Sequence, residues 1–262
     1  MSSTEPMSAL AGQLADARAT GELIDGTPFE SIPSLNDAYH IQQLATEAYD
    51  SPRIGYKVGA TNEAVQKLFG ADSPFYGPMF DSDRYAVNSD IPLAPGILGG
   101  EAEFAFVCGE DFPVDQPLST DALPELIKSC HIAVEIVGRR THGDGLPSLH
   151  AAVADFGANV AFIDGTAIDN WHSINLASIQ VTASSGGEQT NSGTGAAVLG
   201  HPLNSLLWLH NALRQRALPQ KQSLRRGDWV STGTCLGVIA ATPDASVDVE
   251  FEGCGSIRYT LK

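Results

Sequence analysis

The chain has 262 residues, 43% of them hydrophobic, which is enough to bury the core of one large domain or two modest ones. Its formal net charge of −16 argues against binding to nucleic acid or to anionic membrane surfaces, because both need basic patches. The sequence has no run of 18 apolar residues, so no membrane-spanning helix is expected. We also expect no signal peptide, because the N-terminus has no basic segment followed by an apolar one.

The cysteines favour a reducing compartment. Cys108, Cys130, Cys235 and Cys254 are far apart and form no C-x-x-C pair, and two of them stand in strand-like runs. This arrangement is typical of buried free thiols. A cytoplasmic enzyme is therefore the default expectation.

The first fifty residues are expected to be largely helical. Residues 8–18 and 35–49 have apolar side chains at helical spacing, and Pro28 and Pro33 interrupt the chain between them. From about Arg53 onward, glycine and β-branched residues become frequent and short strands are expected. The order predicts a helical N-terminal region that leads into a mostly β, α+β domain.

Three helices are expected within the strand-rich part, at residues 63–69, 122–130 and 204–217. The C-terminus alternates polar and apolar residues over 248–252 and again over 256–261, with glycines between. This pattern predicts a strand, a tight turn and a second strand.

The most informative feature is a set of three acidic residues in strand-like apolar surroundings. Glu101 and Glu103 begin the run EAEFAFVC, and Glu135 lies inside the run HIAVEIV. Side chains alternate along a strand, so Glu101 and Glu103 face the same way. A buried carboxylate is costly unless it is paired or bound to a metal, and three together suit a hard divalent cation such as Mg²⁺ or Mn²⁺. The alternative is that they pair with Lys57, Arg139 or Arg140, or face solvent.

Other stretches are compatible with a site. Lys57 lies between Gly55 and Gly59 in a strand, where it could orient a carboxylate or move a proton with a pKa lowered by burial and cationic neighbours. An edge-strand lysine in water is the alternative. Tyr76 precedes a Gly-Pro turn, a plausible pocket rim. Residues 227–234 (GDWVSTGT) predict a strand ending in a glycine turn whose hydroxyl and backbone donors suit a carboxylate.

The motifs argue against several other types of site. Residues 193–202 are rich in glycine but do not have the GK[ST] ending of a phosphate loop. The chain has no Gly-x-Ser-x-Gly elbow and no H-E-x-x-H, which argues against serine hydrolases and zinc proteases. His201, just before Pro202 and a predicted helix, is expected to be a structural or capping residue rather than a base.

Together these stretches resemble the 2-keto-4-pentenoate hydratase family, which includes the 4-oxalocrotonate decarboxylases and lies within the fumarylacetoacetate hydrolase superfamily. The resemblance extends from about Asp37 to the end of the chain, and the order and spacing of its motifs carry it. These motifs are AYHIQ (38–42), GYKVGAT (55–61), YGP (76–78), EAEFAF (101–106), VEIV (134–137), GAAVLGHPLN (195–204) and RGDWVSTG (226–233).

The resemblance implies the mixed-sheet, barrel-like fold of the fumarylacetoacetate hydrolase C-terminal domain. Residues 53–262 would form this catalytic domain and residues 1–52 the helical N-terminal region. It implies that Glu101, Glu103 and Glu135 are ligands of Mg²⁺ or Mn²⁺ and that Lys57 is the active-site lysine. A glutamate at the third position resembles the hydratase and decarboxylase branch.

The chemistry implied is that of a metal-dependent hydro-lyase of aromatic catabolism. Its substrates are small 2-hydroxydienoates or their 2-oxo-enoate tautomers, whose carboxylate and 2-oxygen can chelate a divalent cation. The cation stabilises charge on the 2-oxygen while water adds at C4, giving a 4-hydroxy-2-oxo acid. A decarboxylase of a 2-oxo-3-enedioate uses the same stabilisation. The resemblance also implies a homo-oligomer.

Two segments depart from the family pattern and make the substrate end of the expected pocket more apolar. Phe156 and Asn159 stand where many members have polar residues and a serine, and Phe75 stands where many have an acid. The residues expected to line the substrate pocket are Phe75, Tyr76, Asp155, Phe156, Asn159, Thr232 and Thr234.

Three functional hypotheses follow. The first is a hydratase of a short 2-hydroxydienoate. The second is a decarboxylase or another enolate-forming enzyme of the superfamily, for which Arg139, Arg140 or Asn159 would anchor a second carboxylate. The third is a non-catalytic or regulatory homologue, against which the retention of all three glutamates and Lys57 argues.

Overall fold

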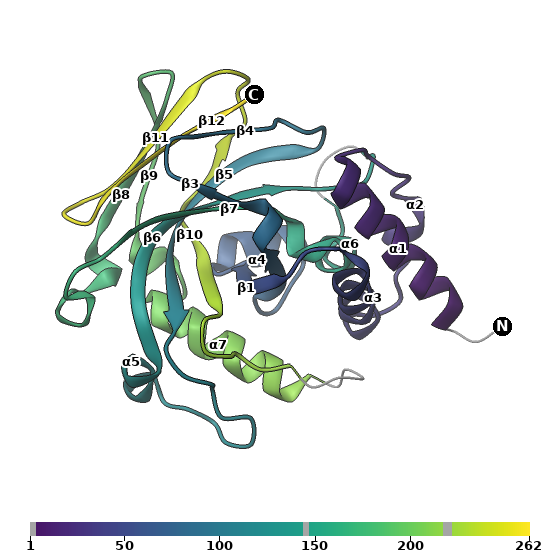
Figure 1. The fold of residues 1–262 in the computed structure, drawn as a ribbon, viewed down its shortest axis with the longest axis horizontal. Coiled ribbons are helices and arrows are strands. Elements are labelled where there is room, and N and C mark those ends of the chain that lie inside the picture. Colours follow the sequence, from purple (N-terminus) through teal and green to yellow (C-terminus); the bar gives the residue numbers. More distant parts are fainter. Residues whose placement is uncertain (1–3, 144–146, 217–221) are drawn as a thin grey trace.

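The N-terminal region of the computed structural model, which describes residues 4–143, 147–216 and 222–262, is helical. Figure 1 shows its three helices packed beside the β part of the molecule. The Ser34 hydroxyl caps the third helix by accepting a hydrogen bond from Asp37 N at 3.1 Å. The helices are α1 (Thr4–Thr20), α2 (Thr27–Glu30) and α3 (Leu35–Ala48).

The β part consists of two sheets (Figure 1). The first has seven strands, and its neighbours pair antiparallel except for β1 with β10 and β3 with β7. In spatial order its strands are β2 (Phe75–Phe80), β1 (Arg53–Gly59), β10 (Trp229–Ala240), β5 (Ile97–Cys108), β6 (Ile127–Gly138), β7 (Asn159–Ala167) and β3 (Arg84–Ala86).

The second sheet has five strands and includes the predicted C-terminal hairpin, which the structure confirms as β11 and β12. In spatial order its strands are β4 (Ser89–Ile91), β12 (Gly255–Leu261), β11 (Ser246–Phe251), β8 (Gln180–Ser185) and β9 (Glu188–Thr194). The mixed sheet with helices confirms the predicted α+β fold.

Among the described residues, four more α-helices connect the strands: α4 (Glu63–Phe69), α5 (Leu123–Leu126), α6 (Leu149–Ala154) and α7 (Pro202–Gln215). The expected helix ending at residue 217 corresponds to α7, although residue 217 itself lies outside the described residues. His201 caps α7 as expected, because its Nδ1 accepts a hydrogen bond from Leu203 N at 3.1 Å.

The helix expected at residues 122–130 is wrong beyond residue 126. Helix α5 has only four residues, and the chain then enters β6 at Ile127. Cys130 and Ser129 pair with Phe106 and Val107 of β5. The neighbouring strand supplies the backbone partners here, so sheet pairing overrides the local helical pattern.

The alternation predicted for the EAEFAFVC run positions the site. Ala102, Phe104 and Phe106 of β5 are fully buried in the main hydrophobic core. Ala105 and Val107 belong instead to a smaller cluster on the other face of the sheet, with Met79, Ala133, Phe162 and Trp229. The face that carries this second cluster also carries the acidic side chains.

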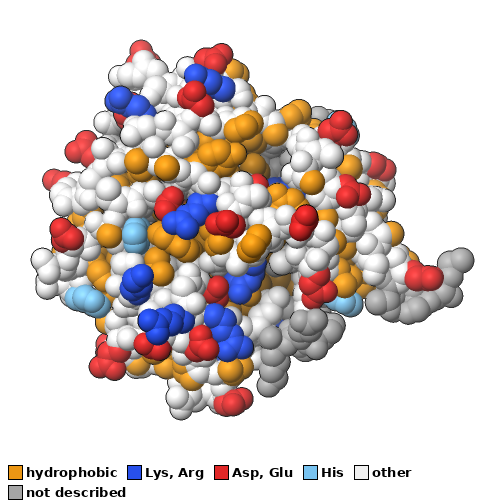
Figure 2. Space-filling model, viewed as in Figure 1, with side chains coloured by type: hydrophobic (Ala, Val, Ile, Leu, Met, Phe, Trp, Pro, Cys, Tyr) orange, Lys and Arg blue, Asp and Glu red, His pale blue; other side chains and the backbone are white. Residues whose placement is uncertain are grey.

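The charged surface residues and the free cysteines of the structure are as the sequence composition predicts. Figure 2 shows acidic and basic side chains interspersed over one face of the molecule. Cys108, Cys130 and Cys235 are buried and Cys254 is half-buried, and all four are free thiols, as expected. Among the described residues, no helix combines the length and apolar character needed to cross a membrane.

Candidate metal and active site

Strand pairing brings the three glutamates together. Glu101 of β5 lies directly opposite Glu135 of β6, and Glu103 lies on the same face of β5. One carboxylate oxygen from each residue lies within 4.8 Å of the other two. Glu103 and Glu135 are completely buried, and Glu101 is partly exposed, so it marks the side from which a small molecule can approach.

Glu103 is held by strand β10. Its Oε2 accepts hydrogen bonds from Ser231 Oγ at 2.5 Å and from Gly233 N at 2.8 Å. The pairing of β10 with β5 is irregular at this point, and Gly233 has a φ of 104°, which turns its N–H toward the carboxylate. A side chain there would clash with Thr61, whose Oγ1 would lie 2.3 Å from the added Cβ.

The stretch 227–234 was expected to bind a carboxylate through hydroxyl and backbone donors. The structure supports that chemistry, but the carboxylate is the protein's own Glu103. Thr232 and Thr234, expected in the pocket, use their hydroxyls elsewhere: Thr232 Oγ1 donates to Phe104 O at 2.8 Å, and Thr234 Oγ1 donates to Gly237 O at 3.1 Å. Sequence reasoning therefore missed Ser231, which the alternation along the strand could have identified.

Glu135 is held by Asn159 and faces Lys57. Its Oε1 accepts a hydrogen bond from Asn159 Nδ2 at 2.9 Å. The Lys57 ammonium lies 3.3 Å from Oε2 of Glu135, which makes an ion pair but not a hydrogen bond of good geometry. Because both side chains are buried, this pair interacts in a poorly screened environment.

Lys57 is fixed by strand β1 and by the loop after α6. Its Nζ donates to Gly157 O at 2.9 Å. Phe156, Gly157 and Ala158 all have positive φ values of 51°, 65° and 63°, a strained backbone for the two that are not glycine. The loop can approach only because Gly77 has no side chain: an added Cβ there would lie 2.0 Å from Phe156 O.

The buried charges are unbalanced within the protein. Burial raises the pKa of Glu101 to about 7, with Lys57 opposing and Glu135 adding to the effect. Burial and the neighbouring carboxylates raise the pKa of Glu103 well above its usual value, and burial likewise raises that of Glu135. Burial alone would lower the pKa of Lys57, but the charge of Glu135, followed by the other two glutamates, raises it. The expected lowering of this pKa is thus reversed by the carboxylates.

The cluster fits a hard divalent cation. All three donors are carboxylate oxygens, the type that Mg²⁺ and Mn²⁺ prefer. Oε1 of Glu103 and Oε2 of Glu135 are buried and accept no hydrogen bond from the described residues. Three carboxylates beside one ammonium leave negative charge in a buried place, which a divalent cation would offset.

Two aromatic residues expected in the pocket lie on opposite faces of β2. Phe75 faces the site, with the Lys57 ammonium 5.4 Å from the centre of its ring. The Tyr76 ring is completely buried on the other face, 4.4 Å from that of Tyr39, and its hydroxyl lies 3.4 Å from Gln222. The structure therefore does not bring the Tyr76 side chain to the glutamates.

The remaining expected residues are occupied by internal contacts. Asp155 accepts hydrogen bonds from Arg140 N at 2.7 Å and Arg140 Nη1 at 2.8 Å. Phe156 is buried, and the guanidinium groups of Arg18 and Arg140 lie 4.8 and 5.1 Å from its ring centre. Asn159 uses its side chain between Glu135 and Arg18. Arg18 is a second residue near the site that sequence reasoning missed.

The fold is shared with several solved structures, one of them named as a fumarylacetoacetate hydrolase family protein. It is similar to 4-oxalocrotonate decarboxylase from Pseudomonas putida G7, complexed with magnesium and adipate, with a TM-score of 0.89, 24% identity and coverage of 100% of this chain and 99% of that one. A fumarylacetoacetate hydrolase family protein from Yersinia pestis CO92 aligns with a TM-score of 0.58 at 14% identity, over 81% of this chain and 95% of that one. Fumarylpyruvate hydrolase from Pseudomonas aeruginosa, in complex with Mn²⁺ and pyruvate, has a TM-score of 0.58 at 15% identity, over 81% and 91%.

Sequence comparison narrows the class to one family. The chain is 30% identical to 2-keto-4-pentenoate hydratase from Burkholderia vietnamiensis G4, covering 100% of this chain and 99% of the relative. It is also 30% identical to 2-hydroxyhexa-2,4-dienoate hydratase from Comamonas testosteroni, covering 94% of this chain and 93% of the relative. No family model matches the chain. By these relatives, the chain belongs to the 2-keto-4-pentenoate hydratase family.

Proposed function

We propose that this protein is a divalent-metal-dependent hydratase that adds water to a 2-hydroxy-2,4-dienoate and forms a 4-hydroxy-2-oxo acid. The observation that carries the proposal is the cluster of three glutamates beside Lys57. Two of the glutamates are completely buried, and each of these has a carboxylate oxygen that accepts no hydrogen bond from the described residues. The relatives at 30% identity, named as hydratases of 2-keto-4-pentenoate and 2-hydroxyhexa-2,4-dienoate, support the substrate class.

Glu101, Glu103 and Glu135 would hold the ion, Mg²⁺ or Mn²⁺. When bound, the ion would act as a Lewis acid toward the substrate's carboxylate and 2-oxygen and would stabilise negative charge on the 2-oxygen. Ser231 and Gly233 restrict Glu103, and Asn159 restricts Glu135. Such outer partners keep ligands in place and so support metal affinity.

Lys57 would bind the substrate carboxylate or relay a proton. An ammonium has three N–H donors. One bonds to Gly157 O, and the ion pair with Glu135 restricts the direction of a second. The third can be directed at a substrate beside the glutamates. Because the carboxylates raise its pKa, Lys57 carries its proton at neutral pH while the site is without a cation.

The surroundings favour a hydratase over a decarboxylase of a diacid. A second substrate carboxylate needs a cationic or polar anchor, for which Arg139, Arg140 and Asn159 were the candidates. Arg140 is bonded to Asp155, and Asn159 is bonded to Glu135. Arg139 lines a different cavity, whose lining includes neither Lys57 nor any of the three glutamates.

Phe75 supports the same preference. Its ring lies 5.4 Å from the Lys57 ammonium and is packed against Phe69, with ring centres 5.6 Å apart. This places an apolar surface where a charged substrate end would lose hydration without gaining a partner. A decarboxylase remains the second candidate because of the fold shared with 4-oxalocrotonate decarboxylase.

Product analysis separates these candidates. The protein would be supplied with Mg²⁺ and given fresh 2-hydroxypenta-2,4-dienoate or, separately, a 2-oxo-3-enedioate. A 4-hydroxy-2-oxo acid from the first substrate supports the hydratase. CO₂ release from the diacid alone would replace it by the decarboxylase. Turnover of neither, with metal bound, would contradict both and favour the non-catalytic homologue or a different substrate selected by Phe75 and Phe156.

The assembly and location form part of the proposal. We expect a cytoplasmic homo-oligomer, on the basis of the family resemblance and the free cysteines. Light scattering coupled to size-exclusion chromatography would contradict the expected homo-oligomer if it gave the mass of a single chain.

A further inference from the structure

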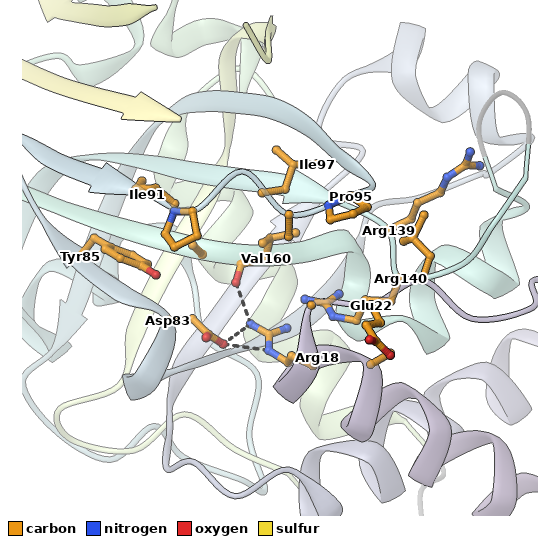
Figure 3. A pocket seen from close by; sticks show the side chains of 16 residues that line it. Arg18, Glu22, Asp83, Tyr85, Ile91, Pro95, Ile97, Arg139, Arg140 and Val160 are labelled. Atoms are coloured by element: carbon orange, nitrogen blue, oxygen red, sulfur yellow. Dashed lines mark hydrogen bonds and ion pairs between the residues drawn. The ribbon is translucent and has the colours of Figure 1, made fainter. Parts of the chain in front are cut away.

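Arg18, in the last turn of α1, extends from the helical region into the β part of the molecule. It lines a cavity of about 140 Å³ together with Asp83, Val160 and Arg140. Figure 3 shows its guanidinium directed toward Asp83 and Val160. The Arg18 side chain is only 2% exposed. Its Nε donates to Asp83 Oδ2 at 2.8 Å and its Nη2 to Val160 O at 3.1 Å.

Two further hydrogen bonds connect Arg18 to Asn159. Nη1 donates to Asn159 O at 2.9 Å, and Nη2 donates to Asn159 Oδ1 at 2.9 Å. The Asn159 Nδ2 in turn donates to Glu135 Oε1, also at 2.9 Å. A continuous buried chain of hydrogen bonds therefore leads from the N-terminal helix to a carboxylate of the glutamate cluster.

The donors and acceptors in this series of hydrogen bonds fix the orientation of the Asn159 amide. A guanidinium has only donors, so it can bond only to the carbonyl end of the amide. That leaves the NH₂ end directed at Glu135, where it meets an acceptor. With the amide turned over, NH₂ would face the guanidinium and the carbonyl oxygen would face the carboxylate, and both contacts would be repulsive.

We propose that Arg18 is a positioning residue of the metal site, acting through Asn159 on Glu135, so that helix α1 forms part of the catalytic architecture. The inference rests on the proposed function in one respect, that Glu135 is a metal ligand. It adds a residue 117 positions away in sequence from the glutamate whose carboxylate it orients.

Packing alone does not account for a guanidinium here. Arg18 and Arg140 both donate to Asn159 O, Arg140 through Nη2 at 2.6 Å, so two like charges lie close together in a buried place. Burial and the charge of Arg140 lower the pKa of Arg18 to about 10. An apolar side chain could fill the same space without this cost, but it could not orient the amide.

The test is a double-mutant cycle read by Mn²⁺ affinity, measured by electron paramagnetic resonance on metal-free protein. Arg18→Met and Asn159→Ala are each expected to weaken Mn²⁺ binding by about tenfold, the lower end for outer-sphere partners. The double variant should bind about as weakly as Asn159→Ala alone, because the proposed effect of Arg18 on Glu135 is transmitted through that amide. Unchanged affinity in Arg18→Met, or losses that add in the double variant, would overturn the proposal.

A matched control is Arg84→Met. Arg84 also makes an ion pair with a residue of β7, Asp164. The hydrogen bonds that Asn159 makes with side chains of the described residues go instead to Arg18, Arg140 and Glu135. Loss of the Arg84 side chain should leave Mn²⁺ affinity unchanged, and a tenfold loss there would show that any arginine near β7 has the same effect, contrary to the proposal.

A conservative variant covers the case in which Arg18→Met does not fold. The shorter lysine of Arg18→Lys can pair with Asp83 but does not place a donor where Nη2 meets Asn159 Oδ1. Mn²⁺ affinity should fall several-fold, and an affinity equal to that of the wild type would overturn the proposal. Wild-type protein that binds no Mn²⁺ would overturn the metal site itself. Mn²⁺ binding that is insensitive to Arg18 would overturn only the positioning role.

Discussion

The Lys57 ammonium lies 3.3 Å from Glu135 Oε2, and the two side chains are 3% and 0% exposed. This buried pair connects the proposed proton-carrying residue to a proposed metal ligand. The oxygen nearest the ammonium is also one of two buried cluster oxygens that accept no hydrogen bond from the described residues. Lysine and ligand variants should therefore have different effects on turnover and metal binding.

Replacement of Lys57 should affect catalysis more than metal binding. In Lys57→Ala the proton relay is lost, and a loss of about 10²–10⁴ in kcat is expected for a general acid–base group. Mn²⁺ affinity should be retained, because the three carboxylates remain and a competing positive charge is gone. Steady-state kinetics and Mn²⁺ titration of the same preparation check both parts; unchanged kinetics would remove Lys57 from the mechanism.

Glu103→Gln should abolish metal-dependent turnover while the fold remains intact. The variant loses one anionic ligand, so Mg²⁺ should no longer raise its melting temperature as ligand binding does for the wild type. Without metal it should be at least as stable as the wild type, because an amide is less costly to bury than a carboxylate. Glu250→Gln, at an exposed position of β11, is the control. Full activity of Glu103→Gln would contradict the site assignment.

Gly77→Ala should damage both stability and catalysis. The added Cβ would lie 2.0 Å from Phe156 O, so the loop that presents Gly157 O to Lys57 must move. Overpacking of this kind costs about 1–3 kcal/mol. Gly12→Ala, in α1 with open space around it, should instead stabilise by about 0.5–1 kcal/mol. Urea unfolding and kcat measure the two effects; a Gly77→Ala variant with wild-type values for both would contradict this account of the loop.

The cap of α7 should make stability depend on pH. Burial lowers the pKa of His201, whose neutral Nδ1 accepts from Leu203 N. The stabilisation is therefore complete above the ordinary histidine pKa of about 6.5 and is lost as pH falls through the lowered pKa of the folded state. His201→Asn keeps a capping acceptor that does not titrate. The free energy of unfolding should decrease more between about pH 7.5 and pH 5 in the wild type than in the variant. Equal decreases in the two proteins would contradict the capping role.

Local pattern accounts for what the sequence analysis predicted correctly. The alternation of EAEFAFVC determines that Glu101 and Glu103 share a face, and a second apolar strand with one acid suggested that Glu135 joins them. The same reasoning predicted the C-terminal hairpin and the cap at His201.

What could not be predicted depends on contacts between distant segments. Nothing near Asn159 indicates that its amide would lie between Glu135 and Arg18, the latter 141 positions away. Tyr76 belongs to a motif of the family resemblance, yet its side chain faces the core because it alternates with Phe75 along β2. Residues 127–130 fit a helical pattern until pairing with β5 is taken into account.

The most direct test of the central claim is the metal dependence of hydration. Wild-type protein would be stripped with a chelator, given 2-hydroxypenta-2,4-dienoate, and followed by product analysis before and after addition of Mg²⁺ or Mn²⁺. If the glutamate cluster holds a catalytic cation, the 4-hydroxy-2-oxo acid forms only after the ion is restored. Formation of the same product at the same rate in the stripped protein would contradict that claim.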